Sequence, residues 1–239
     1  MSRGPLLLAI DTSSSRPGIV LAAPDSVLAE IVLDDDGRGE SLCDRIPALV
    51  EDAGVDLAAV EYLAVARGPG SFTGIRVGLA LARGLALVDD LPVVGVGSLE
   101  LVALAAADVD RRLCAVLQAG QDKLYAAGYE RGLDGTLREA HAPVVIPITE
   151  LDAMLADWGG RLVLCAERYT LDYLRGEQAA KRPDRLVPVP ESRVRLLAST
   201  ALARRDDATR AEAVLPLYVA ESAARPNRNR VVVTPDRRD

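Results

Sequence analysis

Two short stretches of the sequence combine residue types that bind phosphate groups. The first is Asp11-Thr12-Ser13, where a carboxylate and two hydroxyls follow the apolar run Leu6 to Ile10. The second is the turn from Gly68 to Ser71, in which Gly70 precedes a serine placed to begin a helix. A carboxylate can hold a metal bound to phosphate, and a helix N-terminus presents free N–H groups to an anion. The candidate phosphate or nucleotide ligands are therefore Asp11, Thr12, Gly70 and Ser71.

Each stretch also has a purely structural interpretation. Local side-chain hydrogen bonds that close a turn explain Asp11-Thr12-Ser13 equally well. The glycine turn fits neither standard phosphate motif, because no lysine lies between Arg67 and Ala86 and Thr73 stands where a dinucleotide fingerprint has its third glycine. For this turn we favour a helix packed tightly on a sheet or on a partner.

The segment after the turn predicts a helix with one very narrow face, from Ser71 to Val88. Glycine in a helix costs about 1 kcal/mol relative to alanine, so close approach of another backbone is the expected compensation. A second helix, bent at Pro47, is predicted over residues 40–53 from its apolar spacing. The narrow face contains small residues at every fourth position: Gly74, Gly78, Ala82 and Ala86.

Composition and charge exclude several classes of protein. The net charge of −7 argues against a surface that binds nucleic acid unaided. Cys43, Cys114 and Cys165 are far apart, which excludes a CxxC site and fits a reducing compartment, so a cytoplasmic location is expected. His141 is the only histidine, so no metal site is predicted. No apolar run is long enough for a membrane span, and no membrane association is expected.

The order of the predicted elements indicates two similar α/β lobes. Three strands within residues 6–33 are followed by helix, strand, helix and strand, and the pattern restarts near Cys114. This is the order of an RNase H-like lobe, and an acidic residue after the first strand is typical of actin-like folds. We predict two such RNase H-like lobes, over 1–102 and, in degenerate form, over 103–224. Residues 225–239 are predicted to be a loosely held basic tail.

Three motifs give the chain a resemblance to a known family. RGPGSFTG over residues 67–74, followed by IRVG, is the strongest of them. AIDTS over residues 9–13 and the sequence GVGSLE over residues 95–100 support it. On these motifs the chain resembles, nearly end to end, the TsaB (YeaZ) family, non-catalytic relatives of TsaD in bacterial tRNA modification.

This resemblance implies an α/β actin-like fold of two lobes and an accessory role. Members of the family pair with TsaD and with the ATPase TsaE, and the complex transfers threonylcarbamoyl to N6 of the adenosine next to the anticodon of tRNAs that read ANN codons. It implies a pseudoenzyme without a cofactor of its own, because ATP, Mg and the TsaD metal belong to the complex. Ser98 and Val102 stand where the catalytic relative has two metal-binding histidines. The chain is expected to contact tRNA only through the complex and to form a homodimer when alone.

The resemblance also implies where the partner binds. The two predicted helices are expected to lie side by side and to form half of a helical bundle with TsaD. The arginines of this set are equally compatible with ordinary solvated side chains. The predicted partner-interface residues are Ser41, Leu42, Arg45, Gly74, Arg76, Gly78, Ala82 and Arg83.

Four positions depart from the pattern of many family members: Ser41, Gln118, Glu167 and Ala220. The last three are expected to face the cleft between the lobes, which predicts a weak or absent nucleotide site. The competing function is an actin-like ATPase or small-metabolite kinase that uses Asp11 and the Gly68 to Ser71 turn. Such an enzyme would need a second phosphate loop and an acid in the second lobe, and Gln118 and Glu167 argue against both. A scaffold unrelated to tRNA is the third possibility.

Overall fold

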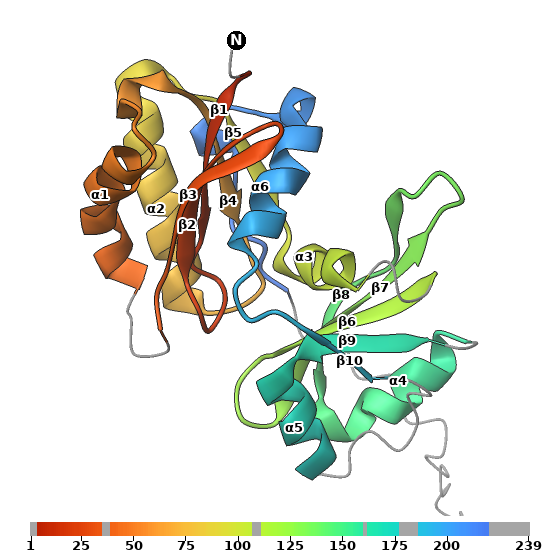
Figure 1. The fold of residues 1–239 in the computed structure, drawn as a ribbon. Helices are drawn as coiled ribbons and strands as arrows, with labels where there is room; N and C mark the ends of the chain where they lie inside the picture. The colour runs from red at the N-terminus through yellow and green to blue at the C-terminus, as the bar shows by residue number, and fades with distance from the viewer. Residues whose placement is uncertain (1–3, 35–38, 107–110, 160–161, 177–185, 220–239) are drawn as a thin grey trace, which may run out of the picture.

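Two mixed β-sheets form the framework of the computed structural model (Figure 1). The structure describes residues 4–34, 39–106, 111–159, 162–176 and 186–219. The predicted basic tail over 225–239 and Ala220 lie outside the described residues. Each sheet belongs to one α/β lobe, so the predicted two-lobe actin-like, RNase H-like fold is confirmed.

The first sheet has the strand order β3-β2-β1-β4-β5. β1 pairs antiparallel with β2 and parallel with β4. Every residue of β1 and β2 is buried, as expected for near-continuous apolar strands in a sheet that is covered on both faces. The strands are β1 (Leu6–Asp11), β2 (Gly18–Ala23), β3 (Ser26–Val32), β4 (Val60–Ala66) and β5 (Val93–Val96).

Two helices that lie side by side cover one face of this sheet, α1 (Ile46–Asp52) and α2 (Phe72–Asp89) (Figure 1). The 3-10 helix η1 (Gly39–Arg45) precedes α1, and η2 (Leu57–Ala59) follows it. The helix predicted over residues 40–53 is therefore confirmed for its second half, whereas its first half is a 3-10 helix and the predicted bend at Pro47 is wrong. Pro47 lies in the first turn of α1, where its missing N–H removes no helical hydrogen bond, so the helix begins there instead of bending. No helix among the described residues is long and apolar enough to cross a membrane.

The second sheet repeats the topology of the first. Its order, β10-β9-β6-β7-β8, is the same sequence of antiparallel and parallel pairs counted from the opposite edge. The lobe predicted as degenerate thus has a complete five-stranded sheet, including β10, which the sequence analysis did not predict. Its elements are β6 (Arg112–Gln118), β7 (Lys123–Arg131), β8 (Leu137–Pro147), η3 (Ile148–Glu150), α4 (Leu151–Asp157), β9 (Val163–Glu167), α5 (Arg168–Gly176) and β10 (Leu186–Val189).

The remaining two helices are exchanged between the lobes. α3 (Ser98–Ala105) follows β5 but packs through Leu99 and Val102 on the second sheet. α6 (Val194–Ala203) follows β10 but packs through Val194 and Leu197 on β1 and β2, and Figure 1 shows it beside the first sheet. The boundary drawn at residues 102 and 103 therefore falls inside α3, and the predicted second lobe includes a helix of the first. The segment after α6 contains η4 (Arg205–Asp207) and η5 (Ala211–Ala213).

Candidate functional site

The two predicted phosphate-binding stretches meet at one edge of the first sheet. β1 and β4 are parallel neighbours, so the loops that follow them leave the sheet at the same edge. The backbone N–H of Ser71 donates to the carbonyl of Ser13, at 3.1 Å. A Cβ added to Gly70 would lie 2.3 Å from that carbonyl oxygen. The two turns are thus packed directly against each other.

A chain of buried hydrogen bonds forms the floor of this site. Ser98 Oγ donates to Ser13 Oγ at 2.8 Å, and Ser13 Oγ donates to Asp11 Oδ1 at 2.7 Å. Oδ1 also accepts from the backbone N–H of Ser13, at 2.9 Å. Asp11 is buried, and its Oδ2 has no donor among the described residues. Local hydrogen bonds therefore account for one carboxylate oxygen and leave the other unused.

The small-sided face of α2 packs on the loop that follows β1. A Cβ added to Gly74 would lie 1.9 Å from the carbonyl oxygen of Thr12, and one added to Gly78 would lie 2.3 Å from the Thr12 hydroxyl oxygen. That hydroxyl donates to the Gly74 carbonyl at 2.6 Å. The predicted close approach is confirmed, but the approaching backbone is the chain's own. Gly74, Gly78 and the buried Ala82 therefore lie inside the lobe and do not present a face to a partner.

The other residues predicted for the partner interface are dispersed. Leu42 is fully buried in the core of the first lobe. Arg83 donates to the backbone carbonyls of Ala211, at 3.4 Å, and Val214, at 3.0 Å, so its charge is used within the chain. Arg45 and Arg76 are exposed, and the side chain of Ser41 lies outside the described part of the structure. Helical spacing showed which residues share a face but not which face points outward.

The outward side of α2 is a different, apolar surface. Ala80 and Gly84 are exposed there, and a Cβ added to Gly84 would meet no atom within 4 Å. Leu87 and Val88, in the last turns of the helix, are 76% and 79% exposed. This outward face of α2 (Ala80, Gly84, Leu87 and Val88) was missed by the sequence analysis. The sequence signal that could have identified this face is the absence of charged residues at these four positions, which share one side of the helix.

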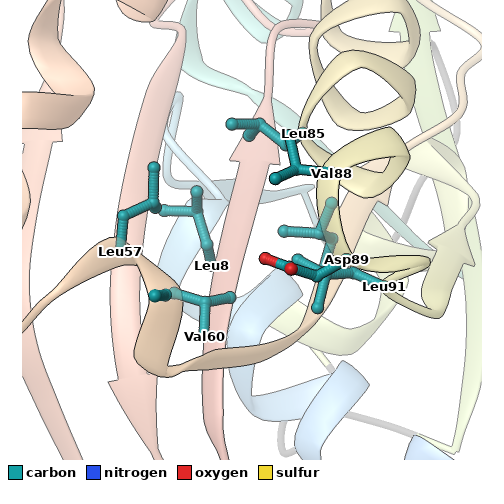
Figure 2. Close-up of a pocket in the computed structure, with 9 residues that line it drawn as sticks. Leu8, Leu57, Val60, Leu85, Val88, Asp89 and Leu91 are labelled. Carbon is teal, nitrogen blue, oxygen red and sulfur yellow. The ribbon is translucent and has the colours of Figure 1, made fainter.

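An apolar groove adjoins this face at the C-terminal end of α2, with a volume of about 150 Å³ (Figure 2). Leu57 of η2 and Val88 of α2 lie on opposite sides of it in Figure 2, and the Asp89 carboxylate points between the two sides. The lining residues are Leu8, Leu57, Ala58, Val60, Leu63, Leu85, Val88, Asp89 and Leu91.

A larger cleft of about 310 Å³ lies between the two lobes. The expectation that Gln118 and Glu167 face this cleft is confirmed. Its first-lobe wall contains Gly70 and Ser71, so the candidate phosphate turn and the altered second-lobe positions do share one cavity. The remaining lining residues are Ser13, Ser14, Ser15, Leu117, Tyr169 and Thr170.

A buried ion pair joins the lobes beside this cleft. Glu167 ends β9 of the second sheet and accepts a hydrogen bond from Arg193, which directly precedes α6 on the first lobe. The two side chains are 9% and 0% exposed. Burial raises the pKa of Glu167; Arg193 opposes this shift, and the charges of Asp11 and Glu191 add to it. The sequence identified Glu167 as unusual but gave no signal for Arg193, because the pair is 26 residues apart.

Comparison with known proteins gives concordant matches. The family model described as "TsaD: tRNA N6-adenosine threonylcarbamoyltransferase" matches residues 39–181. The tRNA threonylcarbamoyladenosine biosynthesis protein TsaB of Bacillus subtilis is 33% identical over 64% of the chain, and that of Escherichia coli is 33% identical over 54%. These matches span only 63% and 57% of the relatives' own lengths. The solved structure of YeaZ from Pseudomonas aeruginosa, 27% identical, covers 90% of the chain and 100% of its own, with a TM-score of 0.72.

Proposed function

The chain belongs to the TsaD family of tRNA N6-adenosine threonylcarbamoyltransferases, and on this premise we propose that it is an accessory subunit in tRNA threonylcarbamoyladenosine biosynthesis. In this role it assembles with a TsaD subunit and the ATPase TsaE and takes no part in catalysis. The complex installs threonylcarbamoyl on N6 of the adenosine next to the anticodon of tRNAs that read ANN codons.

The observation that carries this proposal is the outward face of α2. Exposed large apolar side chains that gather on one helix mark a protein contact, and Leu87 and Val88 are such side chains. Ala80 and Gly84 allow a partner helix to approach closely, and the groove at Leu57 continues the surface. The proposed occupant is a TsaD subunit, which is related to this chain. A second copy occupies the face when TsaD is absent, because two related surfaces meet across a two-fold axis. Arg45 is proposed for the rim of this contact.

The absence of catalysis is proposed from the chemistry at two positions. Ser98 and Val102 occupy the places where the resemblance puts metal-binding histidines in the catalytic relative. Here Ser98 donates its hydroxyl hydrogen to Ser13, and Val102 packs in the apolar core of the second sheet. Neither side chain binds a transition metal as imidazole does.

A weak or absent nucleotide site is proposed from the hydrogen bonds in the cleft. The N–H groups of Ser13 and Ser71 are already bonded within the chain, and the Glu167 carboxylate on the opposite wall, which accepts from Arg193, offers phosphate no hydrogen-bond donor. The nucleotide and metals then belong to the other subunits. The competing phosphotransferase function rests on the unused Oδ2 of Asp11. Micromolar ATP binding by the isolated chain in calorimetry, lost in Asp11→Asn, would favour that competitor.

The test of the accessory role is a dropout reconstitution. TsaD, TsaE, tRNA, threonine, bicarbonate, ATP and the adenylate-forming synthase are combined with and without this chain, and modified adenosine is measured. We expect modification to require the chain and to fall at least about tenfold with Gly84→Trp, which blocks the outward face without a clash in the fold. Ala156→Trp, on an exposed position of α4, is the matched control and should leave modification unchanged. Equal modification without the chain contradicts the accessory role.

A further inference from the structure

A second, smaller pocket lies between the lobes and is lined by charged side chains from both. This Arg67 pocket has a volume of about 150 Å³ and shares no lining residue with the larger cleft. Arg67 comes from the first lobe, Glu100 from α3, and Tyr129 and Glu139 from the second sheet. Pockets for drug-sized ligands have volumes of roughly 300–1,000 Å³, so any ligand of this pocket is small.

Arg67, the first residue of the RGPGSFTG motif, is held in place by its backbone. Its N–H donates to the carbonyl of Val96 at 2.9 Å, and its carbonyl accepts from Leu217 at 2.8 Å. A Cβ added to Gly95 would lie 3.3 Å from Arg67 Cδ, so the aliphatic part of the side chain packs on β5. Its Nε is buried without a hydrogen-bond partner, and within the described ranges no carboxylate forms a salt bridge with it. A ligand of opposite charge would explain this unused donor.

Tyr129 and Glu139 supply the other polar groups of the pocket. They are paired directly across β7 and β8, so they lie on the same face of the second sheet. Burial, followed by the charges of Glu100 and Glu139, raises the pKa of Tyr129, so its hydroxyl remains a hydrogen-bond donor at neutral pH. Glu100 is already paired with Arg204, at 2.6 Å, whereas Glu139 forms no salt bridge with any residue that the structure describes. Glu139 therefore keeps an unused negative charge.

The pocket thus contains one cation and one anion that do not pair with each other. Arg67 and Glu139 line the same small cavity, yet no salt bridge joins these two described side chains. A simple anion would be repelled by the glutamate, and a simple cation would be repelled by the guanidinium. A zwitterion satisfies both charged groups at once. Leu99 and Leu137 also line the pocket, which favours a ligand with a short aliphatic part.

We propose that the Arg67 pocket binds a small α-amino acid as its zwitterion. The planar guanidinium of Arg67 holds the ligand carboxylate through two N–H donors, and the Tyr129 hydroxyl donates to the same carboxylate. Glu139 accepts hydrogen bonds from the ligand ammonium group. Because the ligand contacts both lobes, its binding stabilises their arrangement. This inference goes beyond the accessory role and does not depend on it.

The experiment measures the binding of small amino acids to the full chain by calorimetry. L-Alanine is compared with propionate, which lacks the ammonium group, and with ethylamine, which lacks the carboxylate. We expect alanine to bind at least about tenfold more tightly than either, because each analogue leaves one charged group of the pocket unpaired. L-Tryptophan is too large for the pocket and should not bind. Alanine at about a hundred times its Kd should raise Tm by about 5–10 °C.

Substitutions separate the two ends of the ligand. Arg67→Gln should weaken the binding of both alanine and propionate by about tenfold or more, because it removes the charged donor to the carboxylate. Glu139→Gln should weaken alanine binding by a similar factor without weakening propionate binding. Tyr129→Phe removes only the hydroxyl and should weaken alanine binding by about twofold to tenfold. Arg67→Lys keeps the charge but not the planar pair of donors, so its affinity should be intermediate.

Matched controls remove equivalent charges outside the pocket. Arg138→Gln, on the same strand as Glu139, and Glu51→Gln, on α1, change exposed residues and should leave alanine affinity unchanged. Circular dichroism shows whether each variant is folded, and Arg67→Lys with Glu139→Gln decides the question if Arg67→Gln is not. Absence of alanine binding, equal affinity for alanine and propionate, or full affinity in Arg67→Gln overturns the proposal. Because no TsaD, TsaE or tRNA is present, the result is independent of the dropout assay.

Discussion

The two lobes have the same sheet topology but differ at the turn that leads from the fourth strand to the following helix. In the first lobe that turn contains Gly70, which lies against the Ser13 carbonyl where a Cβ would be 2.3 Å away. The second lobe has no such turn, because β9 ends at Glu167, whose carboxylate is paired with Arg193, and α5 begins at the next residue. Gly120, in the turn after β6, has no atom within 4 Å of an added Cβ. The first lobe thus joins its two turns by backbone contact, whereas the fourth strand of the second lobe ends in a side chain that forms an ion pair with the other lobe.

This difference extends to the helices. α2 has 18 residues and its inner face is shaped by two glycines, whereas α5 has nine. The long helix reaches from the cleft at Ser71 to the groove at Asp89, so it alone connects the cleft to the outward apolar surface. The same sheet topology is therefore combined with a long helix in the first lobe and a short one in the second. The packing of α2 on the loop after β1 and the ion pair between Glu167 and Arg193 can be tested separately.

The largest effect is expected at the buried ion pair. Arg193→Met leaves the Glu167 carboxylate buried without its partner, which should lower the free energy of unfolding by about 3–5 kcal/mol. The double variant Glu167→Gln with Arg193→Met removes both charges and should recover most of that loss. Urea unfolding of wild type, both single variants and the double variant gives the coupling free energy. A double variant as unstable as Arg193→Met alone would show that the pair does not act as a unit.

The next effect separates the two faces of α2. Gly74→Ala places a methyl group against the Thr12 carbonyl and should cost about 1–3 kcal/mol. Gly84→Ala meets open space and should stabilise the helix by about 1 kcal/mol. Both substitutions replace a glycine of α2 with alanine, so a destabilising effect at Gly74 alone reports the contact with the loop after β1. Thermal and urea unfolding measure both, and equal effects would contradict the close packing.

Much of this fold was predictable from local sequence signals. The apolar run before Asp11 predicted β1, and Ser71 was predicted to begin α2, where its side chain does accept from the Gly74 N–H. The spacing of the small residues correctly placed them on one face. Each signal concerns residues close in sequence, for which strand alternation and helical periodicity are sufficient evidence.

The remainder depended on contacts that no local pattern contains. A narrow helical face packs equally well on its own lobe or on a partner, so the spacing of Gly74 and Gly78 could not give its direction. The predicted lobe boundaries divided α3 and assigned α6 to the second lobe, but α3 packs on the second sheet and α6 on the first. The ion pair of Arg193 with Glu167 could not be predicted for a related reason. It forms only because α6, which follows a strand of the second sheet, packs on the first lobe.

A smaller, pH-dependent effect should follow from Glu167. Burial holds its folded pKa above the usual 4.5, so the stability that this group contributes is fully present below about pH 4.5 and is lost as pH rises through the folded pKa. Glu167→Gln removes that titration. The free energy of unfolding of wild type minus that of Glu167→Gln should therefore fall as pH rises from about 4 to about 7. A difference that rises over this range would mean that Arg193 outweighs burial and that the pKa is lowered.

The smallest expected effect is a change in thiol reactivity, for which the three cysteines report on each lobe separately. Cys43 is exposed in η1 of the first lobe, whereas Cys114 and Cys165 are buried in the second sheet. Burial raises the pKa of Cys165 to about 12 and that of Cys114 further, so neither forms a reactive thiolate in the folded lobe.

Thiol titration with a chromogenic disulfide should give one rapid equivalent in the native chain and two more on unfolding. Because both slow thiols belong to one lobe, Arg193→Met should accelerate their reaction and leave that of Cys43 unchanged. Equal acceleration of all three thiol reactions would mean that the ion pair between Glu167 and Arg193 stabilises both lobes together. The two lobes would then unfold as one unit.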